Sequence, residues 1–331
     1  MRLSVIMAVY NANKRFLLRQ LDSIKAQTRA PDEVIISDDN SQDDTAQLIK
    51  NYINKNKLDW TLIAQNSNLG YIGNFAFLLG RAAGDYIALC DQDDLWHDDK
   101  TAVLCSLLDN NPSMQAAACA YGLIDESGEK ITREGNKRSA NHGIYPRPLK
   151  SGEAEPVNSF FTKDMPECLC NRFIGCSLAI RKSVALQYLS YQSHDIPHDW
   201  ELCLIAEASG GLMFLNEELM DYRLHSNNTI GLHLEKKTGI KPDEDSRKRL
   251  AAEFARAVKR MKEICLANGI EAPKNIERYA ENRFKVVSDY SLAAYFRLFL
   301  NIKLYRRQYS LRQRLGDIYT LARHKLSGAK G

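Results

Sequence analysis

Residues 85–99 read DYIALCDQDDLWHDD, and this stretch decides the fold class. An apolar run typical of a buried strand, from Tyr86 to Cys90, ends in a crowd of carboxylates. Asp91, Asp93 and Asp94 follow it directly. Carboxylates this close repel each other and resist joint ionisation. We therefore expect a positive charge among them, at the end of a buried strand.

The rest of the N-terminal part alternates strand and helix patterns. Apolar runs predict strands at 3–10, 33–39, 60–65, 85–90 and 114–125, and amphipathic runs predict helices at 16–27, 43–55, 72–83 and 100–111. Such alternation indicates an α/β fold with a Rossmann-like, mostly parallel sheet covered by helices on both faces. We expect loops and a short helix over 126–166, then a strand at 173–182, helices at 183–190 and 199–210, and strand segments at 211–225.

Composition and cysteine usage narrow the class of protein. With 44% hydrophobic and 26% charged residues, the 331-residue chain has an ordinary globular composition. We expect neither a signal peptide nor a membrane-spanning segment, because no apolar window approaches about 20 residues. The eight cysteines include no CxxC pair. Zinc or disulfide sites are possible, but buried free thiols are favoured, which suits a reducing, cytoplasmic setting.

The charge is divided unevenly along the chain. Residues 1–231 carry 22 Lys and Arg against 30 Asp and Glu, whereas residues 232–331 carry 23 against 11. From about residue 245 the pattern is helical and basic to the end. We therefore predict two domains, an α/β domain over 1–232 and a basic helical extension over 233–331.

Polar residues follow three of the predicted strands, at 9–11, 38–41 and 91–94. Ligands of open parallel sheets bind beyond the carboxyl ends of the strands, so these residues converge if the strands are neighbours. Helix capping is the alternative for Asn40, Ser41 and Asp43. It does not explain the acids at 91–94, which precede Leu95 and Trp96 rather than a helix start.

Two nucleotide-binding motifs are excluded. A dinucleotide-binding fold needs a glycine-rich first turn, and here that turn reads VYNANKRF. A P-loop is absent as well. What remains is a nucleotide whose diphosphate is reached through a hard cation, and a DxD at a strand end offers carboxylates to Mg²⁺ or Mn²⁺. That cation supplies the expected positive charge.

Five blocks in order carry a family resemblance: SVIMAVYN, VIISDDNSQDDT, NLGYIGN, AAGDYIALCDQDD and HDWELCLIAEASG. Over roughly residues 2–230 the chain resembles glycosyltransferase family 2, inverting enzymes of the GT-A fold. DQDDLW, HDW and YRLHSNNTIG resemble the bacterial rhamnosyltransferase-like branch, which builds surface polysaccharides. That branch often shows HDWW where this chain has Glu201, which weakens the sugar assignment and leaves the chemistry untouched.

The resemblance implies a role for each matching residue. Asp199 is implied as the catalytic base, and His225 as a residue near the diphosphate that joins Asp91 and Asp93 as metal ligands. Nucleotide-sugar binding is implied for Val9, Tyr10, Asn11, Asp39, Gly70, Asn74, Asp91 and Gln92. Helix capping is the alternative for Asp199, and a loop histidine without a ligand is the alternative for His225.

The implied activity is metal-dependent, inverting transfer of a sugar, with rhamnose from dTDP-rhamnose as the first candidate. The implied acceptor is a bacterial surface polysaccharide, either a glycan or a polyprenyl-linked glycan. One alternative keeps the fold with a UDP-hexose or UDP-N-acetylhexosamine donor. The other is a non-catalytic nucleotide- or carbohydrate-binding protein.

Residues 292–315 place Tyr, Phe and Leu among Lys and Arg at helical spacing. Two interpretations stay open. The helices pack on the α/β domain with a solvated basic face, or they contact the anionic inner face of the cell membrane. Nucleic-acid binding is disfavoured, because the acidic strand ends would repel a polyanion.

Overall fold

The computed structural model describes residues 1–131, 149–157, 173–191, 195–225, 244–273 and 275–300, together with 314, 317–319, 321 and 322. The chain divides into two compact units: Met1–Asn158 with Asn171–Leu232, and Ser159–Cys170 with His233–Gly331. The assignment of 1–232 to catalysis and of 233–331 to an accessory role stays a prediction.

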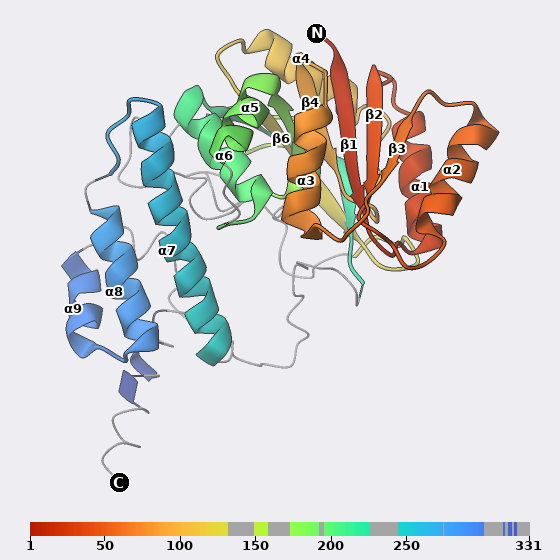
Figure 1. The fold of residues 1–331 in the computed structure, drawn as a ribbon. Coiled ribbons are helices and arrows are strands. Elements are labelled where there is room, and N and C mark those ends of the chain that lie inside the picture. The colour runs from red at the N-terminus through yellow and green to blue at the C-terminus, as the bar shows by residue number, and fades with distance from the viewer. Residues whose placement is uncertain are drawn as a thin grey trace. The chain divides into compact units, whose positions relative to one another are not determined.

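A single sheet forms the centre of the first unit (Figure 1). Its strands are β1 (Leu3–Val9), β2 (Glu33–Asp38), β3 (Thr61–Ala64), β4 (Tyr86–Cys90), β5 (Leu95–Trp96), β6 (Ala116–Ile124), β7 (Ala154–Val157), β8 (Leu178–Arg181) and β9 (Leu212–Arg223). They lie in the order β3-β2-β1-β4-β8-β6-β9-β5, and β7 also pairs with β9.

The register of the parallel strands brings three strand ends to one edge. Val9 of β1 lies opposite Asp38 of β2, and Met7 of β1 lies opposite Cys90 of β4. The residues that follow β1, β2 and β4 therefore emerge side by side. This confirms the condition on which the predicted convergence of polar residues depended.

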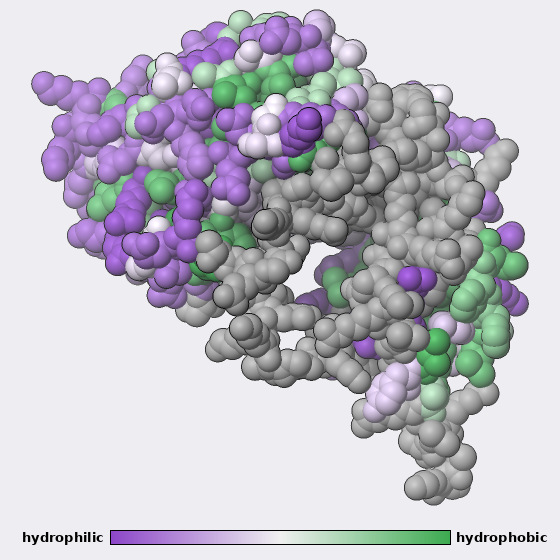
Figure 2. Space-filling model, turned by 180° about the vertical axis from the view of Figure 1, so that it is seen from behind, coloured by the Kyte–Doolittle hydropathy of each residue, from purple (hydrophilic) through white to green (hydrophobic). Residues whose placement is uncertain are grey.

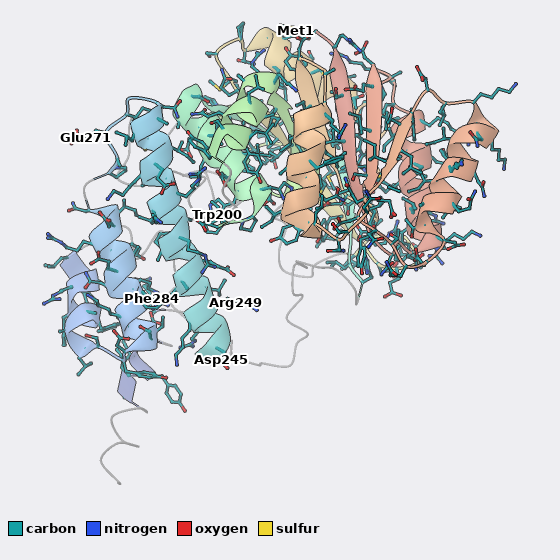
Figure 3. All side chains as sticks on the ribbon, in the orientation of Figure 1. Met1, Trp200, Asp245, Arg249, Glu271 and Phe284 are labelled. Atoms are coloured by element: carbon teal, nitrogen blue, oxygen red, sulfur yellow. The ribbon has the colours of Figure 1, made fainter. Side chains whose placement is uncertain are left out.

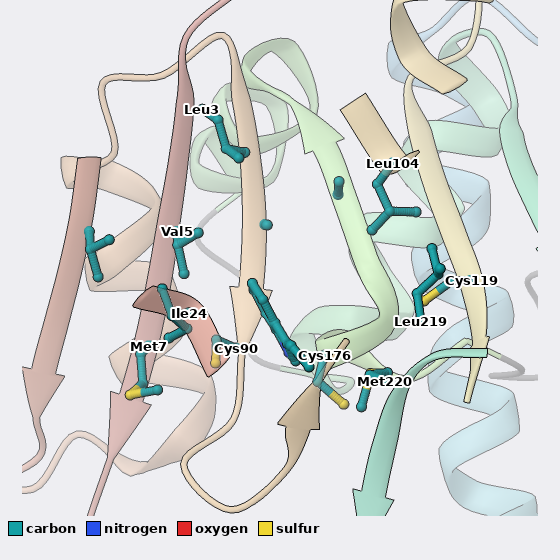
Figure 4. Packing of buried hydrophobic residues seen from close by; sticks show 14 of the residues in the cluster. Leu3, Val5, Met7, Ile24, Cys90, Leu104, Cys119, Cys176, Leu219 and Met220 are labelled. Atoms are coloured by element: carbon teal, nitrogen blue, oxygen red, sulfur yellow. The ribbon is translucent and has the colours of Figure 1, made fainter. Parts of the chain in front are cut away.

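Helices cover both faces of the sheet, as predicted. They are α1 (Lys14–Lys25), α2 (Thr45–Asn56), α3 (Gly70–Arg81), α4 (Lys100–Asn110), α5 (Lys182–Tyr191) and α6 (His198–Ser209). Figure 4 shows the core against one face, where Val5 and Met7 of β1 pack with Ile24 of α1 and neighbouring side chains. The opposite face is covered by α3, α5 and α6 (Figure 1). With both faces covered, β1 and β4 are buried along almost their whole length.

The α/β class is confirmed, and the sheet adds three features that the sequence pattern did not predict. Strand β8 runs antiparallel between β4 and β6, so the parallel run β3-β2-β1-β4 is followed by a mixed region. Strand β7 lies in a stretch that was expected to form loops. Strand β9 is one continuous strand rather than several segments. An apolar run carries no information on the direction of its partner, and pairing with neighbours decides it.

The cysteines agree with the favoured interpretation where the structure describes them. The six described cysteines form no disulfide and are buried: Cys90, Cys105, Cys119, Cys176, Cys203 and Cys265. Cys168 and Cys170 lie outside the described residues. Among the helices of the described part of the chain, none has the length and apolar character needed to cross a bilayer.

The described part of the second unit is helical. It contains α7 (Glu244–Ala267), α8 (Ile276–Ser288) and α9 (Leu292–Leu300). Figure 3 shows their side chains, including Arg249 on α7 and Phe284 on α8. A buried ion pair joins Arg283 of α8 to Asp317, with 3.1 Å between Nη2 and Oδ1. The predicted helical character of 245–300 is confirmed, and most of 301–331 lies outside the described residues.

Candidate active site

A pocket of about 760 Å³ opens at the edge of the sheet where β1, β2 and β4 end. That volume is in the range of small-molecule sites. The eleven residues predicted for the site all line it: Val9, Tyr10, Asn11, Asp39, Gly70, Asn74, Asp91, Gln92, Asp93, Asp199 and His225. Their roles stay predictions, but the fold brings them together.

The turns after β1 and β4 are tied to each other by side-chain amides. Gln92 accepts a hydrogen bond from the Tyr10 backbone N–H at 2.8 Å and donates one to the Tyr10 carbonyl at 3.2 Å. Asn11 has a left-handed backbone, with φ of 41°. Its N–H donates to Ser41 Oγ and its amide oxygen accepts from the Gln42 N–H, both at 2.8 Å. The backbone of 9–11 is thereby held against both neighbouring strand ends.

Asp39 and the loop before α3 form a second part of the wall. Asp39 is buried, and its Oδ1 accepts the Leu69 N–H at 2.7 Å. Gly70 follows with φ of +70°, a conformation that side-chain-bearing residues rarely adopt. Asn74 is 1% exposed and donates to the Ser37 carbonyl at 3.1 Å. Its Oδ1 has no hydrogen-bond partner within the described residues. Buried acceptors without a partner are rare, so this amide oxygen calls for an explanation.

Of the three predicted metal ligands, Asp93 and His225 are in direct contact. His225 Nε2 is 2.8 Å from Asp93 Oδ2, and its ring packs 5.3 Å from the ring of Phe16. The pKa of Asp91 is raised to about 7 by burial, and further by the charges of Asp93 and Asp199. Carboxylate oxygens that repel one another in this way suit a hard divalent cation, which relieves the repulsion. Asp91 and Asp93 thus supply oxygen atoms of the kind that a hard cation prefers, and their role as metal ligands together with His225 stays a prediction.

A second acidic group lies beneath this wall and fits such a cation poorly. Ligand atoms of Asp91, Asp94 and Cys176 lie within 4.8 Å of one another. Burial raises the pKa of the Cys176 thiol well above its ordinary value, so the sulfur keeps its proton. A hard cation prefers oxygen ligands to sulfur.

The interior also supplies a positive charge of its own beneath the acids. The Lys100 ammonium is fully buried, donates to the Cys176 carbonyl and lies 3.6 Å from the centroid of the Trp96 ring. Burial lowers the pKa of Lys100 and the charge of Asp94 raises it, while the charge of Lys100 lowers the pKa of Asp91. Part of the charge expected among the carboxylates thus belongs to the protein itself. Sequence analysis missed Lys100 because a lysine at a helix start gives no sign that it is buried.

Arg223, at the end of β9, holds the acidic turn from the side. Its Nε donates to the Asp93 carbonyl at 2.8 Å and its Nη1 to the Asp125 carbonyl at 2.9 Å. Its backbone N–H donates to Asp94 Oδ1 at 3.1 Å. The guanidinium carbon lies 4.6 Å from the centroid of the Phe16 ring. Arg223 therefore fixes the backbone that carries Asp93.

Asp199 lies in the first turn of α6, beside Gly175. Its Oδ2 accepts the Gly175 N–H at 3.1 Å and its Oδ1 accepts the Trp200 N–H at 2.8 Å. Pro197 is the N-cap residue and makes no side-chain cap hydrogen bond, whereas Asp199 accepts a first-turn N–H of the helix, so the capping alternative for Asp199 stays open beside the catalytic one. Burial raises the pKa of Asp199 to about 6. A carboxylate with such a pKa is ionised at neutral pH and is still able to take up a proton.

The pocket has further lining residues that sequence analysis did not single out: Ala8, Asn13, Phe16, Asn68, Tyr71, Glu126, Ile174, Gly175, Pro197 and Tyr222. Asn68 had a signal, because NSNLG is a turn that precedes a helix. Gly175 had none. A side chain there would begin 3.3 Å from His198 Nε2 and 3.4 Å from Asp199 Cβ, a closeness that only the tertiary structure creates.

Comparison with known proteins identifies the family. Residues 4–188 match the family described as Glycosyl transferase family 2. The chain belongs to this family. Its first unit is accordingly a glycosyltransferase domain, as the resemblance implied.

Several curated proteins are similar to this chain. "Uncharacterized protein Rv1520" of Mycobacterium tuberculosis is 26% identical, over 68% of this chain and 59% of that protein. The matched part of this chain thus spans little more than half the length of that relative. "dTDP-rhamnosyl transferase RfbG" of Shigella flexneri is 24% identical, over 71% of this chain and 77% of that protein. "Amylovoran biosynthesis glycosyltransferase AmsB" of Erwinia amylovora is 26% identical, over 67% and 69%.

A solved structure is similar in fold. It is that of S. aureus TarS 1-349 in complex with UDP-GlcNAc, with a TM-score of 0.53 and 15% identity, over 87% of this chain and 81% of that one. At this identity the likeness concerns the fold alone. It confirms the predicted GT-A class.

Proposed function

We propose that this glycosyltransferase family 2 member transfers a sugar, with inversion and with the help of a divalent cation, from a nucleoside diphosphate to a bacterial surface-polysaccharide acceptor. The observation that carries the proposal is the convergence of Asp199, with a pKa of about 6, and the group Asp91, Asp93 and His225 on one pocket. In this proposal Asp199 is the base, and Asp91, Asp93 and His225 are the ligands of a cation that binds the diphosphate.

The nucleoside part of the donor belongs against Asp39 and Asn74. Asp39 Oδ1 is engaged by the Leu69 N–H, which orients the carboxylate so that its other oxygen is available for a base N–H. The side chain of Asn74 lines the same wall. Gly70, Val9, Tyr10 and Asn11 complete this wall, and Gln92 joins it to the metal-binding side.

The diphosphate belongs beside Asp91, Asp93 and His225. Mg²⁺ or Mn²⁺ held by these side chains would neutralise the charge that builds on the departing diphosphate. Arg223 keeps Asp93 in place through its backbone carbonyl. Phe16 packs against the ring of His225 and restricts its orientation.

Asp199 is the base of the reaction. Its carboxylate removes the proton of an acceptor hydroxyl while that oxygen forms a bond to the anomeric carbon. The bond from the anomeric carbon to the diphosphate oxygen breaks at the same time, and its electron pair leaves with the diphosphate. A single displacement inverts the anomeric centre and needs no second carboxylate.

We favour dTDP-rhamnose as donor, because a relative that aligns with 71% of this chain is described as a dTDP-rhamnosyl transferase. A UDP-hexose or UDP-N-acetylhexosamine is the alternative, and the fold neighbour in complex with UDP-GlcNAc supports it. The acceptor we propose is a glycan, free or polyprenyl-linked, since another relative is described as a polysaccharide-biosynthesis glycosyltransferase. We place the reaction in the cytoplasm, where thiols outside disulfides, such as the six described ones, persist.

A thermal-shift panel tests the proposal first. UDP, dTDP, GDP and ADP, and then their sugar conjugates, are added with and without Mn²⁺. A ligand of the folded state raises its stability in proportion to ln(1 + [L]/Kd), so the true nucleotide stands out and its shift grows with Mn²⁺. The selected donor is then assayed for release of its nucleoside diphosphate.

Release of nucleoside diphosphate separates an enzyme from a binding protein. We expect Mn²⁺-dependent release from one donor, and a transfer product whose anomeric configuration by NMR is opposite to that of the donor. Donor binding without any release would favour the non-catalytic alternative. Retention of configuration would contradict a single displacement.

A further inference from the structure

The helix α9, LAAYFRLFL, is apolar on both of its sides. Ala294, Tyr295 and Leu298 form its buried side within the second unit. The other side carries Phe296, Arg297, Phe299 and Leu300, and these four residues are named the α9 face here. Phe296 is 66% exposed, Phe299 47% and Leu300 82%. A helix that is apolar all round is normally covered on all sides.

The aromatic part of the α9 face is held in place from below. The ring of Tyr295 lies 6.1 Å from that of Phe296 and 5.3 Å from that of Phe299, in edge-to-face arrangements. Figure 2 shows hydrophobic residues, in green, gathered on the surface of the C-terminal unit at the right of the view. Contiguous exposed apolar surface of this kind marks an interaction site.

Charge indicates which kind of partner covers the face. Arg297 is the one charged residue of α9. The sequence that follows, 301–331, contains eight Lys and Arg and a single acid, Asp317. A second copy of the chain would bring the same excess of Lys and Arg with it, and like charges would oppose that contact. An anionic surface is complementary to it.

The dimensions of α9 fit a helix that lies on a bilayer. Nine residues span about 14 Å as a helix, about half of the roughly 30 Å hydrocarbon core. Phenylalanine and leucine beside arginine are the side chains that interfacial helices place at the boundary of headgroups and acyl chains. We propose that the α9 face docks the protein on the surface of an anionic lipid bilayer, with Phe296, Phe299 and Leu300 in the interface and Arg297 among the headgroups.

Co-sedimentation of the full-length protein with vesicles tests this docking. Vesicles of phosphatidylcholine alone are compared with vesicles that also contain phosphatidylglycerol, over a series of salt concentrations. We expect strong binding to the anionic vesicles at low salt, which falls as salt rises because exposed charges are screened beyond about 8–10 Å. Neutral vesicles should bind far less.

Variants assign the binding to the α9 face. Replacing both Phe296 and Phe299 by Ser should weaken binding to anionic vesicles about 10-fold or more, because the interfacial aromatics are lost. The matched control replaces Leu250 and Leu266 of α7 by Ser, which are 55% and 83% exposed in the same unit. That control should bind as the wild type does. Arg297→Glu, which leaves the apolar residues in place, should also weaken binding.

Several outcomes would overturn the proposal. Binding of the Phe variant at wild-type strength would do so, as would equal binding to neutral and anionic vesicles or no binding to either. A wild-type dimer in sedimentation velocity that the Phe variant dissociates, with vesicle binding unchanged, would assign the face to a second copy. Thermal unfolding checks that each variant is folded. Donor hydrolysis by all variants keeps this test separate from that of the proposed catalysis.

Discussion

At the scale of single residues, the proposed chemistry depends on how burial and neighbouring charges change the pKa of a few carboxyl groups. Asp199 receives two backbone N–H groups, which favour its charged form, yet burial outweighs them and its pKa rises to about 6. Asp91, under the additional charges of Asp93 and Asp199, rises to about 7. These acids occupy adjacent parts of one pocket but serve different purposes in the proposed reaction.

The base can be tested by Asp199→Asn. We expect donor binding to be nearly unchanged and turnover to fall about 100-fold or more, the usual scale for loss of a general base. In the wild type, turnover should rise with pH through about 6, because only the ionised carboxylate accepts a proton. Steady-state kinetics over pH 5–8 checks both. Lost donor affinity with intact turnover would make Asp199 a binding residue instead.

The metal site can be tested by Asp93→Ala. We expect transfer to be abolished and the Mn²⁺-dependent part of nucleoside diphosphate binding to disappear, since the cation loses a ligand beside His225. Asp98→Ala is the matched control, because Asp98 is an exposed acid of the same stretch outside the pocket lining. Calorimetric titration with and without Mn²⁺ measures the binding. Full activity of the Asp93 variant, or of the wild type in excess EDTA, would refute the metal role.

Gly175 offers a test of how tightly the base is positioned. A methyl group there would begin 3.4 Å from Asp199 Cβ and 3.3 Å from His198 Nε2, so Gly175→Ala should displace the carboxylate by a few tenths of an ångström. We expect turnover to fall about 10-fold with little change in donor affinity, since catalysis is sensitive to small misplacements. Gly80→Ala is the control, because its new methyl group would meet only Leu189 at 3.8 Å. Equal kinetics of the two variants would show that Asp199 tolerates the shift.

At the scale of elements, β9 connects the core of the sheet to the pocket. It pairs in parallel with β6 and antiparallel with β5, and its last residues reach the acidic turn that follows β4. Arg223 binds the Asp93 and Asp125 carbonyls there, and His225, two residues later, meets the Asp93 carboxylate. Strand pairing thus brings Arg223 and His225 to a turn that lies more than a hundred residues earlier in the chain. The hydrogen bonds of Arg223 with the two carbonyls are called the Arg223 clamp.

Arg223→Lys tests this clamp. Lysine keeps the charge but cannot reproduce the forked geometry that binds two carbonyls. We expect the Mn²⁺ concentration for half-maximal activity to rise about 10-fold, with turnover largely restored at saturating Mn²⁺, because Asp93 is less well positioned. The control is Arg181→Lys, since Arg181 also donates to backbone carbonyls, among them those of Met114 and Leu108, but these lie away from the acidic turn that carries Asp93. If both variants change stability alike and neither changes the metal requirement, Arg223 has a structural role only.

At the scale of the whole molecule, the pocket carries a stability cost that depends on pH. The folded state raises the pKa of Asp199 from 3.8 to about 6, so it binds the proton more tightly than the unfolded state does. Stability contributed by this group is therefore complete below about pH 4 and is lost as pH rises to about 6. The proposed catalytic base is held at the expense of stability at neutral pH.

Asp199→Asn removes this titration. The free energy of unfolding of the variant, relative to the wild type, should increase between about pH 4 and 6 and stay constant above, by at most about 3 kcal/mol. Denaturant unfolding at pH 4, 6 and 8 measures the difference. A difference that does not vary with pH would mean that the Asp199 pKa is ordinary in the folded protein.

The sequence by itself determined the α/β class, the parallel strands β1 to β4, the helical C-terminal part and the eleven predicted residues that meet in the pocket. The fold elements follow from patterns of neighbouring residues: continuous apolar runs and helical periodicity. The strand-end residues follow from polar residues after apolar runs, and Gly70, Asn74, Asp199 and His225 follow from the resemblance to glycosyltransferase family 2. Only the tertiary structure decided the antiparallel insertion of β8, the buried ammonium of Lys100 beneath the acids, the Arg223 clamp and the approach of Gly175 to Asp199. Each joins residues far apart in the chain, and their energies arise from burial and pairing. No local pattern records those, because a lysine, an arginine or a glycine looks the same in sequence whether it is buried or solvated.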